Sequence, residues 1–120
     1  AANQDLKLNL AISYGSRLEI VNAVNQLLEK TANGEKLVID EAAIAEHLYT
    51  AGDPEPDLII RTGGERRLSN FLLWQAAYAE LYFSDIMWPD FTPEDFVEAI
   101  AEYQRRERRF GRISTRRELD

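Results

Sequence analysis

Segments with strand patterns alternate with segments with helical patterns, and this alternation constrains the fold more than any other feature. Residues 6–12 alternate apolar with polar or small side chains, which is the pattern of a half-buried strand. Residues 57–61 form a short, largely apolar run of the kind that buried parallel strands show, and a further strand is predicted around residues 81–83. Helical patterns lie between and after these runs. We therefore expect an α/β fold with a parallel sheet flanked by helices.

Four helices are predicted, most of them from a start or stop signal. Ser16 and Glu19 form an S-x-x-E capping box, in which each side chain satisfies a free backbone N–H group. Asp40 and Thr92 are N-cap candidates, and Pro93 occupies the first position of the last helix. The four predicted helices cover about residues 16–33, 41–51, 69–75 and 93–110.

Composition excludes several classes of function. The chain has 120 residues, of which 45% are hydrophobic, enough for the core of one domain. It has no cysteine, which excludes disulfide scaffolds, thiolate zinc sites and cysteine nucleophiles. The single histidine, His47, argues against a multi-histidine metal site, and we expect it to be structural. No apolar run reaches the roughly 20 residues that a transmembrane helix needs.

Seven arginines gather between residues 105 and 120. One interpretation is that they complement the dipole of the last predicted helix, because acidic residues lie near its start. The other is a basic tail beyond Gly111. Binding of nucleic acid through this tail is disfavoured by the net charge of −7 and by the lack of interleaved aromatic side chains. We therefore expect no nucleic-acid partner.

The segment 61–70 is the strongest candidate for a binding site. It follows the carboxyl end of a predicted strand, where open α/β sheets bind ligands. Gly63 and Gly64 allow backbone N–H groups to turn toward an anion, and the arginines on either side of them suit phosphate oxygens. Ser69 adds a hydroxyl donor. The same pattern fits an ordinary Gly-Gly turn with surface arginines, and it lacks the spacing of a Walker loop.

Glu80 lies in an apolar and aromatic stretch. Its carboxylate is expected either to face solvent at the end of a strand or to be held in a cleft by a cation. Composition alone favours the solvent-facing position. Asp57, Asp85 and Asp90 fit turn and capping roles better than catalysis.

Several segments closely resemble signatures of the cis-prenyltransferases, above all the bacterial undecaprenyl diphosphate synthases. The strongest is the run from Asp57 to Glu65 that continues as Arg67-Leu68-Ser69-Asn70-Phe71-Leu72-Leu73-Trp74-Gln75. The resemblance extends over nearly the whole chain. Its other parts are Leu10–Ile20, Tyr78–Phe83, Trp88–Phe91 and Arg106–Gly111.

The resemblance implies a Mg²⁺-dependent transferase that condenses isopentenyl diphosphate onto an allylic diphosphate of the farnesyl type. The product would be a cis-polyprenyl diphosphate, a lipid carrier for cell-wall synthesis. Such enzymes are cytoplasmic homodimers, which touch the membrane at most peripherally.

The resemblance also implies residue roles. Arg61, Arg67, Ser69 and the backbone of Leu68 would bind the diphosphate of isopentenyl diphosphate. Glu80 would be a magnesium ligand. Two further candidates, from the family's Arg-x-Gly element, would reach a diphosphate site: Arg109 and Gly111.

Two departures from the family pattern matter. Ser16 stands where family members usually have a second glycine, and we expect the change to be tolerated. The family's Asp-Gly-Asn motif, with its catalytic aspartate, has no counterpart. We therefore expect residues 1–120 to be the C-terminal part of a larger single-domain fold, with no catalytic residue of their own and no activity alone. The alternative is a non-catalytic partner subunit of an active cis-prenyltransferase.

Overall fold

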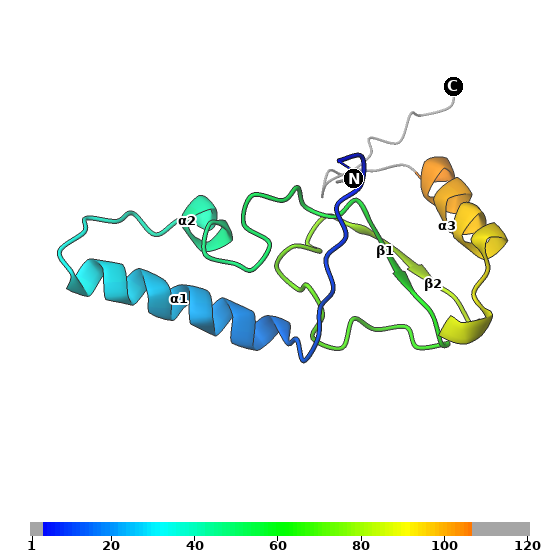
Figure 1. Ribbon diagram of the computed structural model, residues 1–120, viewed down its shortest axis with the longest axis horizontal. Helices are drawn as coiled ribbons and strands as arrows, with labels where there is room; N and C mark the ends of the chain where they lie inside the picture. The colour runs from blue at the N-terminus through cyan, green and yellow to red at the C-terminus, as the bar shows by residue number, and fades with distance from the viewer. Residues whose placement is uncertain (1–3, 107–120) are drawn as a thin grey trace, which may run out of the picture. The chain divides into compact units, whose positions relative to one another are not determined.

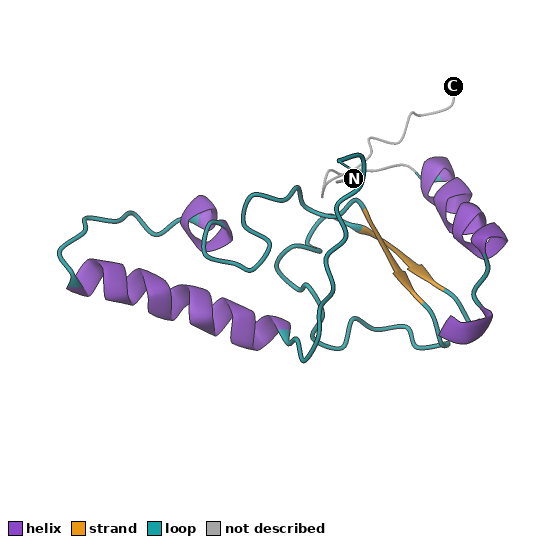
Figure 2. Ribbon diagram, in the orientation of Figure 1, coloured by secondary structure: helices purple, strands orange, loops and turns teal. Residues whose placement is uncertain are grey.

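The computed structural model describes residues 4–106. The chain divides into two compact units, whose elements are drawn in Figures 1 and 2. The first unit combines Ala1–Asp53 with Ser69–Trp74, and the second combines Pro54–Leu68 with Gln75–Asp120. The first contains two helices, and the second contains two strands and a third helix. None of the helices within residues 4–106 is long and apolar enough to cross a lipid bilayer.

Helix α1 (Ser16–Ala32) is the main element of the first unit. It begins after the extended residue Gly15 and ends at Asn33, followed by Gly34 with a φ of 90°. The helix and its stop signal are confirmed. The predicted capping box is wrong, because Gly15 is the N-cap and no side chain caps the helix locally. The side chains of Ser16 and Glu19 instead bind residues far away in the sequence.

Helix α2 (Glu41–Ala45) begins as predicted, since the Asp40 carboxylate accepts a hydrogen bond of 2.8 Å from the N–H of Ala43. It is shorter than predicted, because residues 46–52 form turns. The N–H of Tyr49 donates to the Glu19 carboxylate rather than to a carbonyl of its own turn. A tertiary acceptor has therefore replaced a helical one.

The strand predicted at residues 6–12 is absent. The segment is extended, but within residues 4–106 the only sheet is formed by two other strands. Its alternating apolar side chains are 75–82% exposed at Leu8, Leu10 and Ile12 and at neighbouring Leu6. Alternation alone produces a strand only when a neighbouring strand supplies the hydrogen bonds.

The second unit is built on the parallel pair β1 (Leu58–Arg61) and β2 (Glu80–Phe83). Leu58 is aligned with Glu80, and Arg61 is aligned with Phe83. Both strands, their parallel pairing and hence the α/β fold class are confirmed. The strands are half-buried rather than buried.

Helix α3 (Pro93–Arg105) contacts β2 and follows a short 3₁₀ turn, η1 (Trp88–Asp90). Thr92 is its N-cap, with a reciprocal capping box to Asp95, and proline stands at its start as predicted. The part of the last helix that was predicted beyond residue 106 lies outside the described residues.

The helix predicted at residues 69–75 is wrong. Residues 69–78 are bends and turns. Ser69, Asn70 and Leu72 have positive φ angles of 49°, 65° and 47°. This left-handed conformation costs about 1–2 kcal/mol per residue and cannot continue a right-handed helix.

Candidate functional site

The loop after β1 is fixed by the neighbouring strand. The N–H of Ser84 donates to the carbonyl of Arg61 at 2.8 Å, so that the sheet ladder continues one residue past β2. The N–H groups of Gly63 and Gly64 donate to the carbonyls of Ile86 and Ser84, each at 2.9 Å. Both glycines have positive φ, 91° and 82°, which side chains disfavour. The expectation that these two N–H groups face an anion is therefore wrong, because protein carbonyls already accept from them.

The two arginines singled out in the sequence come together across this loop. The guanidinium of Arg61 donates to the main-chain oxygen of Arg67. Arg67 also forms an exposed ion pair with Glu65, with 2.8 Å between Nη1 and Oε2. Exposed pairs of this kind contribute only about 0–1 kcal/mol, so an anionic ligand can displace the carboxylate at little cost. Two cationic side chains thus lie on one loop at the carboxyl ends of β1 and β2.

The other predicted ligands, Leu68 and Ser69, follow Arg67 in the chain. Leu68 is half-buried and is the last residue of the loop within the second unit. Ser69 is exposed and belongs to the first unit. Arg66 is exposed. Arg109 and Gly111 lie outside the described residues.

Glu80 lies at the other end of the sheet from Arg61. The strands are parallel, and Glu80 is aligned with Leu58, which lies three residues before Arg61. Glu80 and Arg61 are therefore about 10 Å apart along the strand direction. The structure does not bring Glu80 to the two arginines. It pairs Glu80 with the half-buried Arg106 instead, at 3.4 Å, and Arg106 also donates to the carbonyl of Leu81. The cation that holds this carboxylate is thus supplied by the protein.

Metal-ligating side chains are sparse in the described part of the chain. Within residues 4–106, no group of three or more histidine, aspartate or glutamate side chains is placed to hold a metal ion. Mg²⁺ is commonly bound through one or two carboxylates together with substrate phosphates and water. Glu80 therefore fits as one ligand among several, and these residues alone do not form a closed metal site.

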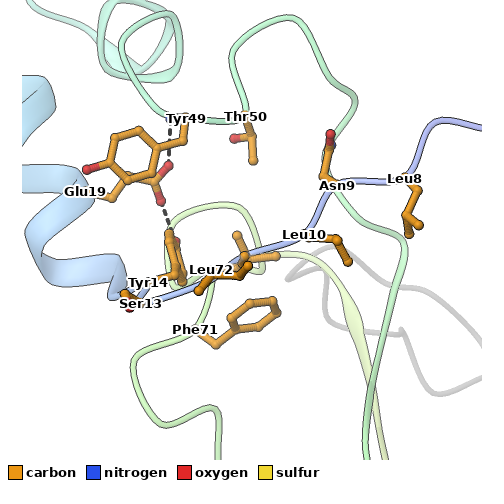
Figure 3. A pocket seen from close by; sticks show the side chains of 12 residues that line it. Leu8, Asn9, Leu10, Ser13, Tyr14, Glu19, Tyr49, Thr50, Phe71 and Leu72 are labelled. Carbon is orange, nitrogen blue, oxygen red and sulfur yellow. Dashed lines mark hydrogen bonds between the residues drawn. The ribbon is translucent and has the colours of Figure 1, made fainter.

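Sequence reasoning missed a buried carboxylate in the first unit. Glu19 is fully buried and accepts hydrogen bonds from the Tyr14 hydroxyl and, at 2.7 Å, from the Tyr49 N–H (Figure 3). The ring of Tyr14 packs edge-on against Tyr49 and against Phe71, with centroids 6.2 and 5.6 Å apart. Burial, followed by the hydrogen bond to Glu19, raises the pKa of Tyr14 above 10.0.

These side chains, together with the segment 8–14, line a pocket of about 540 Å³ (Figure 3). Its walls are largely apolar, with Leu8, Leu10 and Leu72 among them. The sequence does carry a sign that Glu19 is buried. It lies on the same face of α1 as Ala23 and Leu27, which are both buried. Nδ1 of His47 donates to the carbonyl of Ala43 at 2.8 Å, a local contact on its own turn.

The sequence profile of a family described as "putative undecaprenyl diphosphate synthase" matches residues 1–111. An isoprenyl transferase of Geobacillus kaustophilus is 53% identical over 118 residues, which are 97% of this chain and 46% of that protein. The tritrans,polycis-undecaprenyl-diphosphate synthase (geranylgeranyl-diphosphate specific) of Thermoplasma volcanium is 54% identical over 107 residues, 88% of this chain and 42% of that protein. The chain thus spans less than half the length of these curated relatives.

Two solved structures of prenyl diphosphate synthases resemble this chain. The lavandulyl diphosphate synthase from Lavandula x intermedia, in complex with dimethylallyl diphosphate, has a TM-score of 0.80 and 43% identity over 84% of this chain and 44% of its own. A probable undecaprenyl diphosphate synthase from Campylobacter jejuni has a TM-score of 0.72 and 44% identity over 87% of this chain and 47% of its own. With a family match over residues 1–111 and these relatives, the chain belongs to the undecaprenyl diphosphate synthase family of cis-prenyltransferases.

Proposed function

We propose that this chain is the C-terminal part of a cis-prenyltransferase and carries its site for isopentenyl diphosphate. The reaction is condensation of isopentenyl diphosphate onto an allylic diphosphate of the farnesyl type, giving a cis-polyprenyl diphosphate used as a cell-wall lipid carrier. The observation that supports the site is the loop that holds Arg61 and Arg67 together at the carboxyl ends of β1 and β2. The family match supports the reaction class.

The diphosphate is bound by forked donors. The guanidinium groups of Arg61 and Arg67 suit bidentate hydrogen bonds to phosphate oxygens, and Arg67 leaves its exposed pair with Glu65 to make them. The backbone of Leu68 and the hydroxyl of Ser69 add neutral donors. Fixed donors on this diphosphate orient the isopentenyl double bond toward the allylic carbon, which lowers the barrier by positioning.

Glu80 is proposed as one ligand of Mg²⁺, with diphosphate oxygens and water as others. The metal, when bound, neutralises charge on the departing diphosphate. Within this chain, Arg106 holds the Glu80 carboxylate before any metal binds. Arg109 and Gly111 are proposed as further diphosphate contacts.

The remaining machinery comes from elsewhere in the enzyme. No catalytic residue is assigned to this chain, and the Asp-Gly-Asn motif belongs to the N-terminal half. Residues 1–120 alone would therefore bind substrate without turning it over. We propose a cytoplasmic homodimer with peripheral membrane contact at most. Arg61, Arg67 and Glu80 are all present, which favours this function over that of a non-catalytic partner subunit.

The test is steady-state kinetics of the complete enzyme with labelled isopentenyl diphosphate and farnesyl diphosphate. Arg67→Ala should raise KM for isopentenyl diphosphate by about tenfold or more, since a charge-assisted hydrogen bond contributes about 1.5–3 kcal/mol. Arg66→Ala removes the same charge from the next residue and is the matched control, expected to leave KM unchanged. Equal effects of the two variants, or no effect of either, would overturn the proposal.

A further inference from the structure

The backbone conformation of the loop Ser69–Trp74 depends on contacts with other parts of the chain. Ser69, Asn70 and Leu72 all have positive φ angles. Non-glycine residues keep such angles only where the surrounding structure imposes them. The contacts that impose them lie within the first unit, at the start of α1.

Three hydrogen bonds join the loop to the first turn of α1. The N–H of Ser16 donates to the carbonyl of Asn70 at 2.8 Å, and the N–H of Arg17 donates to Oδ1 of Asn70 at 2.8 Å. In return, Oγ of Ser16 accepts from the N–H of Leu73 at 2.9 Å. The first N–H groups of a helix have no acceptor within the helix. Asn70 supplies these acceptors from more than fifty residues away, because no side chain at Gly15 can cap α1.

The junction is tightly packed. Ser16 is fully buried. A Cβ at Gly15 would lie 3.0 Å from Nδ2 of Asn70, so a larger residue there would press on the Asn70 side chain. The ring of Phe71 packs edge-on against Tyr14, on the other side of Gly15. The loop is thus held at Asn70 and at two residues after it, Phe71 and Leu73.

We propose that Ser16 and Asn70 are positioning residues for Ser69, which directly precedes Asn70, and so set the affinity for isopentenyl diphosphate. This inference rests on the proposed function, in which the Ser69 hydroxyl donates to a diphosphate oxygen. The Ser16 hydroxyl holds Leu73 through a hydrogen bond that a glycine at this position cannot make. This bond is one of the three that join the loop to the first turn of α1.

The test is a double-mutant cycle in the complete enzyme. Ser16→Ala and Ser69→Ala should each raise KM for isopentenyl diphosphate about threefold to tenfold, with kcat and the KM of the allylic substrate nearly unchanged. The double variant should be no worse than Ser69→Ala alone, because Ser16 acts through Ser69. Asn70→Gly, which accepts the positive φ but loses Oδ1, gives a second cycle with Ser69→Ala that does not depend on burial at residue 16.

Thr31→Ala is the matched control. It removes a hydroxyl hydrogen bond of 2.7 Å, to the carbonyl of Leu27, at the opposite end of the same helix, and should leave KM unchanged. Additive effects in both cycles, or a KM within twofold of wild type for Ser16→Ala and Asn70→Gly, would overturn the positioning role. If Arg67→Ala has no effect, the proposed function fails and this inference with it. If Arg67→Ala acts and Ser16→Ala and Asn70→Gly do not, this inference alone is wrong.

Discussion

The guanidinium of Arg106 lies 3.4 Å from the carboxylate of Glu80, at the amino end of β2. Arg106 also donates to the carbonyl of Leu81 and lies 3.5 Å from the Glu102 carboxylate on α3. The carboxylate proposed as a magnesium ligand is therefore already neutralised by the protein. A metal ion that binds Glu80 therefore approaches a carboxylate that already has a cationic partner.

Glu80→Gln should weaken the use of magnesium. Glutamine keeps the size of the side chain but loses the charge that a hard cation prefers. We expect the Mg²⁺ concentration for half-maximal activity of the complete enzyme to rise about tenfold. Glu98→Gln, which removes an exposed carboxylate paired with Arg105 on α3, is the control. An unchanged magnesium dependence in Glu80→Gln would remove this residue from the metal site.

Glu19→Gln should destabilise the first unit. The carboxylate accepts from the Tyr14 hydroxyl and from the Tyr49 N–H, and a glutamine can accept through only one of its two terminal atoms. Loss of one charge-assisted hydrogen bond in a buried place should lower the free energy of unfolding by about 1.5–3 kcal/mol, measured by urea titration. Glu29→Gln, on an exposed face of α1, should change it by less than about 0.5 kcal/mol. Equal stabilities of the two variants would contradict the buried network.

The raised pKa of Tyr14 should make the free energy of unfolding depend on pH in the alkaline range. Burial and the Glu19 hydrogen bond raise its pKa above 10.0, so the folded state retains the phenolic proton where the unfolded chain loses it. Below pH 10 the stabilisation of the folded state by the protonated Tyr14 is fully present. It is lost as the pH rises from about 10 through the pKa that Tyr14 has in the folded protein. Wild type should therefore lose stability above pH 10 more steeply than Tyr14→Phe, as followed by unfolding at several pH values. Parallel curves would show that Tyr14 titrates normally.

Gly64→Ala tests the loop that carries the arginines. A Cβ at Gly64 meets only Oδ1 of Asp85, at an ordinary 3.7 Å, so space does not forbid it. The φ of 82° does disfavour it, and alanine should cost about 1–2 kcal/mol of stability. Gly64→Asn should cost less, because asparagine tolerates left-handed backbone. A larger loss for asparagine than for alanine in thermal unfolding would show that packing, and not φ, controls this position.

Elements with local signals could be predicted from the sequence. Thr92, Pro93 and Asp95 form a cap entirely within one turn, and α3 begins there. The two apolar runs that became β1 and β2 pair with each other, so they needed no partner outside the described residues. Arg61 and Arg67 were found because both flank one short loop.

Elements that depend on distant contacts could not be predicted. Ser16 and Glu19 have the spacing of a capping box, but Leu73, Tyr14 and Tyr49 take their side chains instead. Residues 69–75 have helical composition, yet hydrogen bonds to α1 hold them in turns. In each case tertiary contacts outweigh the local preference of the segment.

Calorimetric titration of the complete enzyme measures whether the loop of Arg61 and Arg67 binds the diphosphate of isopentenyl diphosphate. With Mg²⁺ and without an allylic substrate, wild type and Arg66→Ala should bind isopentenyl diphosphate with the same Kd. Arg61→Ala and Arg67→Ala should each weaken binding by about tenfold to a hundredfold. Unchanged affinity in both of these variants, with the enzyme folded, would contradict the account.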